Sequence, residues 1–353
     1  MEEYKGDGAM DKVSQKTLEN QAAELSGRKG CISGSTLKII ALTVMLLDHA
    51  AVAILGRILI RQGYLRIMLN TDPAAYAAWQ SENMCILVLY WAMRLIGRLG
   101  FPIFCFLLIE GVRHTQNKVK YALRLGCFAL ISEIPFDLAI RGEILEFSYQ
   151  NVFFTLFLGM VALCAYDFLD SRVIPAYLQS VCLFGGIFVF GMYVTLFLHR
   201  NSQRLFGWYI GPRALIRVMM VVFCIIAFLL GVYAYKLGLE LARSLAADLG
   251  VMGGMMFAAD LLKTDYAALG ILTISVMYFF RKKPVRSMLA GNIVLTLGEL
   301  SEFTSFGALV PIALYNGKRG LKMKYFFYIF YPAHLLILYL AAAAMGMGDI
   351  PGI

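Results

Sequence analysis

Long apolar stretches separated by short polar segments make up most of the sequence from residue 37 onward. Most are close to the twenty residues that an α-helix needs to cross a bilayer. They lack the alternation of polar and apolar residues that is typical of transmembrane β-barrels. The sequence therefore predicts an all-α, polytopic integral membrane protein of about ten transmembrane helices, near residues 37–60, 84–112, 121–140, 151–169, 173–198, 215–236, 245–262, 266–280, 288–314 and 324–346.

Two of these spans are long, and each is interrupted by residues that disfavour a continuous apolar helix. The span 84–112 contains Gly97, and the span 288–314 contains Glu299 and Glu302. Irregular backbone at membrane depth is tolerated only where protein or a water-filled cavity surrounds it. We therefore expect both interrupted spans to line the functional site.

The pattern divides the chain into three regions. Residues 1–36 are polar, show no signal peptide and are expected to form a disordered cytoplasmic tail. Residues 37–346 form a single transmembrane domain, and residues 347–353 form a short tail. The expected location is the bacterial cytoplasmic (inner) membrane, which the chain crosses several times.

Composition supports a lipid environment and excludes several function classes. The chain is 60% hydrophobic and 16% charged, whereas soluble domains are about 45–50% apolar and about 25% charged. The net charge of +9 comes from clusters between apolar stretches, as the positive-inside rule predicts, and not from a nucleic-acid-binding face. The basic stretch 199–217 conflicts with strict alternation of sides, so one boundary is misplaced or one segment is re-entrant. The seven cysteines have no metal-ligand spacing, and we expect no metal.

Ionisable residues inside apolar spans are candidates for function because burying a charge in lipid is costly. The first candidates are Asp48 and His49 in the middle of the first span. A histidine titrates near neutral pH and can move a proton during acyl transfer. Adjacent helical positions point about 100° apart, so we expect Asp48 to pair with an arginine of another span. The alternative is a structural histidine that is hydrogen-bonded within the core.

Arg94 and Arg98 are four residues apart and share one helical face. Guanidinium groups bind phosphate and carboxylate, so both arginines are candidates for binding an anionic substrate. They could instead form structural ion pairs with Asp48, Glu110, Glu133 or Asp137, and the two roles are compatible.

Further polar residues occur in or beside the second, third and fourth spans. Glu110 and His114 form another pair at spacing four, and Glu133 and Asp137 flank Pro135, for which we favour a structural role. Arg124, Asn151 and Thr155 are expected to complete a polar layer around Glu133 and Asp137.

The last third of the chain contributes a second set of candidates. The turn around Tyr315, Asn316, Lys318 and Arg319 has a basic character and exposed backbone amides that suit phosphate, although an ordinary turn explains it equally well. His334 follows a proline in the last span and is either a site residue or a core histidine. Glu299 completes the set of candidate site residues.

Several of these segments together resemble the TraX family, named for the conjugation-associated pilin acetylase. The matching segments are Leu47–His49, Gly97–Gly111, the Ser-Glu-Ile-Pro-Phe-Asp run at 132–137, Asn151–Leu156, Tyr315–Gly320 and Phe330–His334. The resemblance covers about residues 38–160 and 260–340.

The resemblance implies a membrane-bound acetyltransferase, similar in plan to the type-3 membrane acyltransferases. Such enzymes take acetyl from cytoplasmic acetyl-CoA and modify an acceptor in or across the membrane. By position, His49 matches the histidine thought to be catalytic, with Asp48 fixing its environment, and Arg94 and Arg98 match the donor-binding arginines. The acceptor is left open between a peptide amine, a glycan hydroxyl and a small molecule, and direct transfer is favoured over an acyl-enzyme.

Two other function classes fit the same pattern. Interrupted spans with intramembrane ionisable residues are also typical of a proton-coupled secondary transporter. A transporter is not expected to be stabilised by acetyl-CoA. A non-catalytic membrane component of a secretion or conjugation assembly is the other alternative, and it predicts tolerance of neutral substitutions at Asp48, His49 and Arg98.

Overall fold

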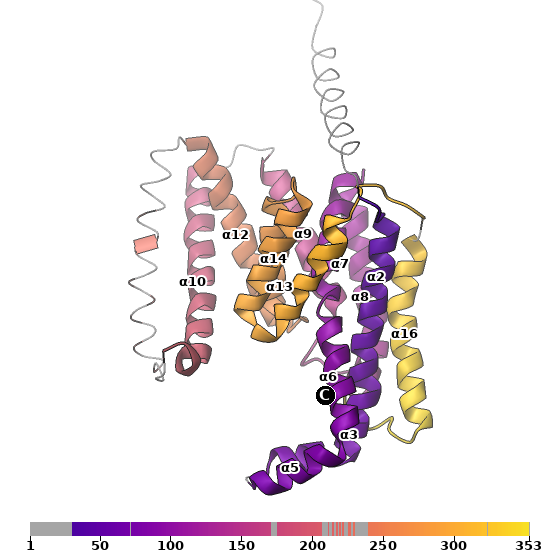
Figure 1. The fold of residues 1–353 in the computed structure, drawn as a ribbon. Coiled ribbons are helices and arrows are strands. Elements are labelled where there is room, and N and C mark those ends of the chain that lie inside the picture. The colour runs from indigo at the N-terminus through magenta and orange to yellow at the C-terminus, as the bar shows by residue number, and fades with distance from the viewer. Residues whose placement is uncertain are drawn as a thin grey trace, which may run out of the picture.

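The computed structural model describes residues 30–70, 72–170, 175–206, 239–322 and 324–352, with isolated positions between 211 and 229. Its helices lie side by side in a bundle, from which α5 projects at the lower end in Figure 1. In chain order they are α2 (Gly34–Ala50), the π-helix η1 (Ala51–Gly56), α3 (Arg57–Arg61), α4 (Tyr64–Met68), α5 (Pro73–Glu82), α6 (Met84–Gly97), α7 (Gly100–His114), α8 (Lys118–Ile140), α9 (Val152–Asp170), α10 (Ala176–Phe206), α12 (Leu239–Leu261), α13 (Ala267–Phe279), α14 (Pro284–Gly298), the 3₁₀-helix η2 (Leu300–Ala308), α15 (Leu309–Ala313) and α16 (Lys324–Ala344).

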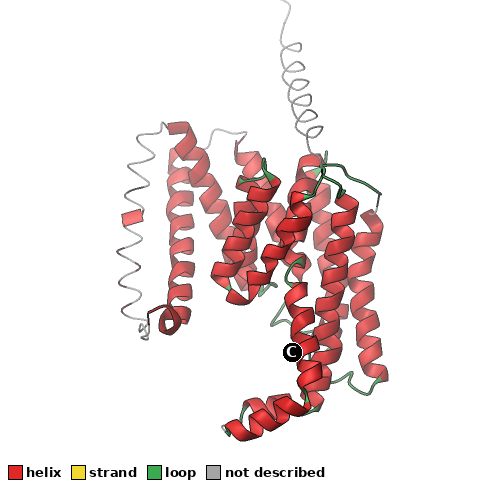
Figure 2. Cartoon of the chain, in the orientation of Figure 1, coloured by secondary structure: helices red, strands yellow, loops and turns green. Residues whose placement is uncertain are grey.

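The described part of the chain is all-helical, with no β-strand and only two isolated β-bridges (Figure 2). Four helical runs are long and apolar enough to cross a bilayer: Gly34–Arg61, Met84–His114, Val152–Leu169 and Tyr325–Ala344. Three shorter apolar helices accompany them, at Val181–Leu196, Ala267–Phe279 and Leu300–Ala313. The all-α class and the membrane character are therefore confirmed.

The predicted spans correspond closely to helices of the structure. Nine of the ten coincide with described helical segments, and the remaining one, 215–236, lies almost wholly outside the described residues. The number of crossings, about ten, stays a prediction. The short helices α4 and α5 between the first two spans were not predicted, and residues 1–29 of the polar tail lie outside the described residues.

The first predicted span is one continuous helical run that changes its winding in the middle. Ser33 begins it by accepting a hydrogen bond from the Thr36 amide at 3.3 Å. The α-helical part ends at Ala50, and a π-helical turn follows. Such turns occur frequently at functional sites. His49 is the second-last residue of α2, just before this change. It lies fifteen residues beyond Gly34, or about 22 Å along the helix.

The start of α2 is attached to the turn that follows α15. The amide of Gly34 donates to the Lys318 carbonyl at 2.8 Å, and the amide of Ser35 donates to the Arg319 carbonyl at 2.9 Å. Two amides of the first turn of α2 are thereby satisfied, although a helix leaves them without partners of its own. This attachment fixes the basic turn at the upper end of the bundle in Figure 1.

α7 occupies the centre of the bundle. It contacts α2, α9, α13, α14 and η2, and eleven of its fifteen residues are buried. α16 packs against α2 and α8 on one side, while α12 and α10 lie on the other side (Figure 1). This arrangement brings the first and last predicted spans together, although nearly 300 residues separate them in the sequence.

Candidate functional site

Six ionisable side chains from four separate segments meet midway along the bundle. We call this group the central cluster. Its members come from α2, the break between α6 and α7, the 3₁₀-helix η2, and α16. They are Asp48, His49, Arg94, Arg98, Glu302 and His334.

Two ion pairs balance the charges of the central cluster. Arg94 Nη1 lies 2.6 Å from Asp48 Oδ2, and Arg98 Nη1 lies 2.8 Å from Glu302 Oε1. The pairing of Asp48 with an arginine of another span is therefore confirmed. Glu302 is a partner that the sequence did not suggest for Arg98. Both arginines are engaged, yet each guanidinium carries five N–H donors and keeps some for a ligand.

Each of these carboxylates has one oxygen without a hydrogen-bond partner among the described residues. These are Asp48 Oδ1 and Glu302 Oε2, and both are buried. A buried carboxylate oxygen normally accepts hydrogen bonds. Asp48 Oδ1 lies against Gly97, because a Cβ at that residue would come within 2.4 Å of it, so this oxygen faces the backbone of α6.

The two histidines of the central cluster contact each other directly. His49 Nδ1 lies 2.7 Å from His334 Nε2, and the rings are within 6° of parallel with centroids 5.0 Å apart. His334 is 4% exposed, whereas His49 keeps part of its surface accessible. His334 therefore belongs to the central cluster, and the direct partner of His49 is His334 and not Asp48.

The two interrupted spans, which were both expected to line the functional site, meet at their breaks. Besides the pair between Arg98 and Glu302, the hydroxyl of Thr304 donates to the Leu95 carbonyl at 2.8 Å. Glu299 lies at the break itself in extended conformation, and its side chain is exposed. Glu302, and not the predicted site residue Glu299, therefore lies in the central cluster, because Glu299 is in extended conformation before η2 begins, whereas Glu302 lies within η2 and is buried.

A polar layer forms around Glu133, although with fewer members than expected. Asn151 donates hydrogen bonds to Glu133 and, at 2.9 Å, to the Ala129 carbonyl. Asp137 accepts from the Glu146 amide at 2.9 Å and so holds the loop after α8. Arg124 does not belong to this layer. It lies nine residues before Glu133, or about 13 Å nearer the start of α8. Its guanidinium stacks over the ring of Tyr121.

The turn between α12 and α13 also reaches this region, and the sequence gave no indication of it. Lys263, Tyr266 and Ala267 all have positive φ, at 54°, 60° and 40°, which is unusual for residues other than glycine. Tyr266 stacks on Phe101 with centroids 3.7 Å apart. Left-handed backbone at several non-glycine positions commonly accompanies functional sites.

Asp265 in the same turn receives a hydrogen bond from the hydroxyl of Tyr149. Burial raises the pKa of the Asp265 carboxyl, although this hydrogen bond opposes the shift. Its electrostatic partners include Asp48, Arg98 and Arg94, so the turn faces the central cluster.

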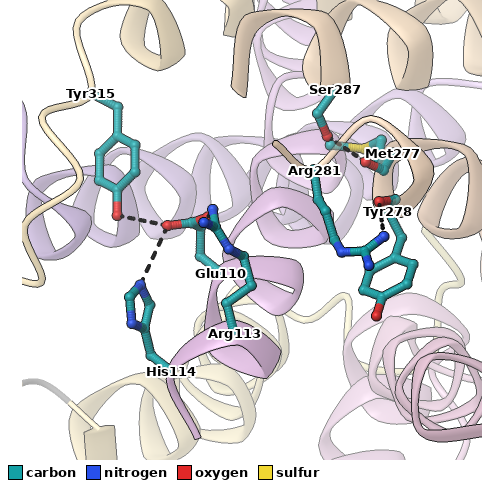
Figure 3. Close-up of polar contacts among 8 residues, drawn as sticks. All are labelled: Glu110, Arg113, His114, Met277, Tyr278, Arg281, Ser287 and Tyr315. Atoms are coloured by element: carbon teal, nitrogen blue, oxygen red, sulfur yellow. Dashed lines mark hydrogen bonds and ion pairs between the residues drawn. The ribbon is translucent and has the colours of Figure 1, made fainter. Parts of the chain in front are cut away.

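A second group of predicted residues lies apart from the central cluster, at the upper end of the bundle in Figure 1, and we call it the end cluster. Glu110 contacts Arg113 Nη1 at 2.8 Å, Tyr315 Oη at 3.2 Å and His114 Nε2 at 3.7 Å (Figure 3). Glu110 lies ten residues beyond Gly100, or about 15 Å along α7. The predicted site residues therefore do not form a single site, but divide among the central cluster, the polar layer around Glu133 and the end cluster with its neighbouring basic turn.

The basic turn lies beside the end cluster. Asn316 accepts a hydrogen bond from the Lys318 amide at 2.9 Å, while the side chains of Lys318 and Arg319 are exposed. The backbone carbonyls of both basic residues are bonded to the start of α2. The exposed cationic side chains therefore remain as the groups that can bind an anion.

The site thus combines the partly buried imidazole of His49, a second imidazole hydrogen-bonded to it and two ion pairs. No group of three or more potential metal ligands occurs among the described residues. These features define an all-helical membrane protein with an ionisable site inside its bundle. The TraX protein family matches residues 33–242 and 218–342, and the chain belongs to that family.

One curated relative is similar over nearly the whole chain. It is the probable fimbrial assembly protein FimC, serogroup H1, of Dichelobacter nodosus, with 28% identity over 317 residues. The similarity covers 87% of this chain and 94% of the relative. No solved structure matches the chain.

Proposed function

We propose that the protein is an acetyltransferase of the bacterial cytoplasmic membrane, crossing it several times and moving acetyl from cytoplasmic acetyl-CoA to an amine or hydroxyl acceptor. The observation that carries this proposal is the hydrogen-bonded pair of His49 and His334 beside a balanced cluster of ion pairs. The TraX resemblance supplies the reaction class. Proton transfer by a positioned imidazole is common in acyl transfer.

The reaction proceeds by direct transfer. The acceptor X–H attacks the thioester carbonyl carbon, and His49 takes its proton as the X–C bond forms. The tetrahedral intermediate then collapses, the C–S bond breaks, and the imidazolium returns the proton to the CoA thiolate. The products are acetyl-X and CoA-SH, so atoms and protons balance.

The donor enters from the end cluster. Lys318 and Arg319 present exposed cations there, and His49 lies about 22 Å along α2 from Gly34, which is bonded to Lys318. The extended arm of CoA can cover this distance, with its phosphates at the basic turn and its thioester near His49. Arg94 and Arg98 use their remaining N–H donors on the donor near the reaction centre.

The choice of acceptor to test rests on the name of the relative, and not on the geometry of the central cluster. A relative named for fimbrial assembly makes an exported surface-fibre subunit the first acceptor to test, followed by glycans and small amines. The geometry at His49 suits either an amine or a hydroxyl.

The test is thermal unfolding of detergent-purified protein with acetyl-CoA, with free CoA and without ligand, beside His49→Ala. Binding to the folded state raises stability by about 2.7 kcal/mol at a ligand concentration of 100 Kd. We expect acetyl-CoA to raise the melting temperature of both proteins and only the wild type to release CoA in the presence of acceptor. No shift at millimolar acetyl-CoA in folded protein would instead favour the transporter.

A further inference from the structure

We propose that His334 is a positioning residue, which holds the proton of His49 on Nδ1 and thereby leaves Nε2 of His49 as the atom that accepts the proton in the transfer. This inference rests on the proposed function for its catalytic meaning. Its structural part, the tautomer of His49, stands on the hydrogen bonds alone.

The assignment begins at the backbone of α16. His334 Nδ1 lies 2.8 Å from the carbonyl oxygen of Phe330, which can only accept a hydrogen bond. His334 Nδ1 therefore carries a proton, and in the neutral ring Nε2 is left with a lone pair. That lone pair lies 2.7 Å from His49 Nδ1, so His49 Nδ1 is the donor. His49 Nε2 then has no proton and can act as a base.

Two observations indicate that both rings are neutral. No carboxylate contacts either ring among the described residues, and Asp48, the residue that precedes His49, is engaged by Arg94. Without an anionic partner, a second charge inside the bundle has nothing to offset its desolvation. The tautomers are assigned from this pattern, because hydrogen positions follow from the network of partners.

Aromatic packing holds the two rings in place. Phe330 stacks on His334 with centroids 4.9 Å apart, and Tyr331 meets His49 edge-on at 5.9 Å. The near-parallel orientation of the two imidazoles follows from this packing and from the hydrogen bond between them. The arrangement is therefore fixed before substrate binds, as efficient proton transfer requires.

His334 performs the task that a carboxylate performs in a Ser-His-Asp triad, where the acid fixes the tautomer of the base. A neutral partner stabilises the imidazolium less than a carboxylate does. It also avoids burying another negative charge at membrane depth, where Asp48 and Glu302 already need arginine partners. A second histidine is thus the partner that suits this environment.

The first arm of the test reads the tautomer directly. The chain has only four histidines, so ¹⁵N-histidine labelling of protein in lipid bilayers gives four rings, assigned with His49→Gln and His334→Gln. We expect a protonated Nδ1 and an unprotonated Nε2 for His49, and loss of this fixed preference in His334→Leu. A protonated Nε2 on His49 of the wild type would overturn the inference.

The second arm measures acetyl-CoA turnover. Fixing the wrong tautomer of a catalytic histidine costs up to about 10⁴-fold in kcat, so we expect His334→Leu to lose about 10²–10⁴-fold in kcat with an unchanged KM for acetyl-CoA. His334→Gln places an amide oxygen where Nε2 lies and should recover at least about tenfold of that loss. A merely structural role would not give this recovery at equal melting temperature.

His199→Leu is the matched control, because His199 lies in α10 and belongs to neither the central cluster nor the end cluster. If the wild type turns over acetyl-CoA and His334→Leu has the same kcat, the positioning role is overturned while the acetyltransferase proposal stands. If the wild type itself releases no CoA, the proposed function fails, and the ¹⁵N spectra still decide the tautomer.

Discussion

The guanidinium of Arg98, at the break between α6 and α7, lies 2.8 Å from the carboxylate of Glu302 in the 3₁₀-helix η2. This ion pair joins two interrupted helical runs across about 200 residues of sequence. The Glu302 side chain is 2% exposed, so its charge has little solvent to stabilise it. Arg98 therefore compensates a charge that would otherwise be costly inside the bundle.

Replacing Arg98 by methionine should destabilise the fold more than replacing both partners. Removing one member of a buried pair leaves the other charge uncompensated, at a cost of about 3–5 kcal/mol. The double variant Arg98→Met, Glu302→Gln leaves no charge and should recover part of that loss. Reversible unfolding in detergent gives the comparison, and Glu299→Gln is the control because Glu299 is exposed. If the losses in free energy of unfolding caused by the two substitutions simply added in the double variant, Arg98 and Glu302 would not stabilise each other.

Gly97 is expected to be required for the pairing of Asp48 with Arg94. A Cβ at residue 97 would lie 2.4 Å from both Cβ and Oδ1 of Asp48, which is impossible without displacement. Gly97→Ala should therefore cost about 1–3 kcal/mol, as overpacking does, and should reduce acetyl-CoA turnover.

Gly254→Ala provides the matched control for this substitution. Gly254 is also helical, and a Cβ there would meet nothing within 4 Å. We expect it to be neutral or slightly stabilising in the same unfolding assay. Equal effects of the two substitutions would show that helix propensity, and not the contact with Asp48, explains the loss at Gly97.

The sequence predicted most of the helices because hydropathy reports directly on burial in lipid. It also predicted the breaks in the two long spans, since Gly97 and Glu299 disfavour an apolar helix. The pairing of Asp48 with an arginine followed from charge alone, because an intramembrane carboxylate needs a partner. These features depend on local composition or on charge balance, which one sequence displays.

The partnerships between distant helices were not predictable in the same way. His334 could have faced the core, a lipid or any of several helices, and only packing of α16 against α2 brings it to His49. Glu299 and Glu302 are three residues apart, and the extended backbone at Glu299, just before η2 begins, separates the exposed side chain from the buried one. The turn containing Tyr266 has no sequence signal, because its left-handed backbone occurs at residues other than glycine.

Relief of backbone strain should stabilise the turn between α12 and α13. Lys263 is exposed and has a φ of 54°, a conformation that costs a residue with a Cβ about 1 kcal/mol. Lys263→Gly should therefore raise the free energy of unfolding by roughly that amount. Lys283→Gly is the control: its φ of −123° is ordinary, so glycine there should be neutral or destabilising. The same loss in both variants would contradict strain at Lys263.

Asn151 and Asn117 allow a comparison between a buried and an exposed helix-starting asparagine. Asn117 only accepts a hydrogen bond from the Lys120 amide at 2.8 Å, so Asn117→Ala should cost about 1 kcal/mol. Asn151 is fully buried and makes three contacts: it accepts from the Phe153 amide at 3.0 Å and donates to Glu133 and to the Ala129 carbonyl.

Asn151→Ala should therefore cost at least about 3 kcal/mol, because it leaves a buried amide, a buried carbonyl and the Glu133 carboxylate without their partners. The additional variant Asn151→Ala, Glu133→Gln should regain part of this loss, since it removes the carboxylate that lacks a donor. Thermal and denaturant unfolding of the three variants in one detergent measures the differences. A loss at Asn151 no larger than that at Asn117 would show that the polar layer around Glu133 contributes little beyond an ordinary helix start.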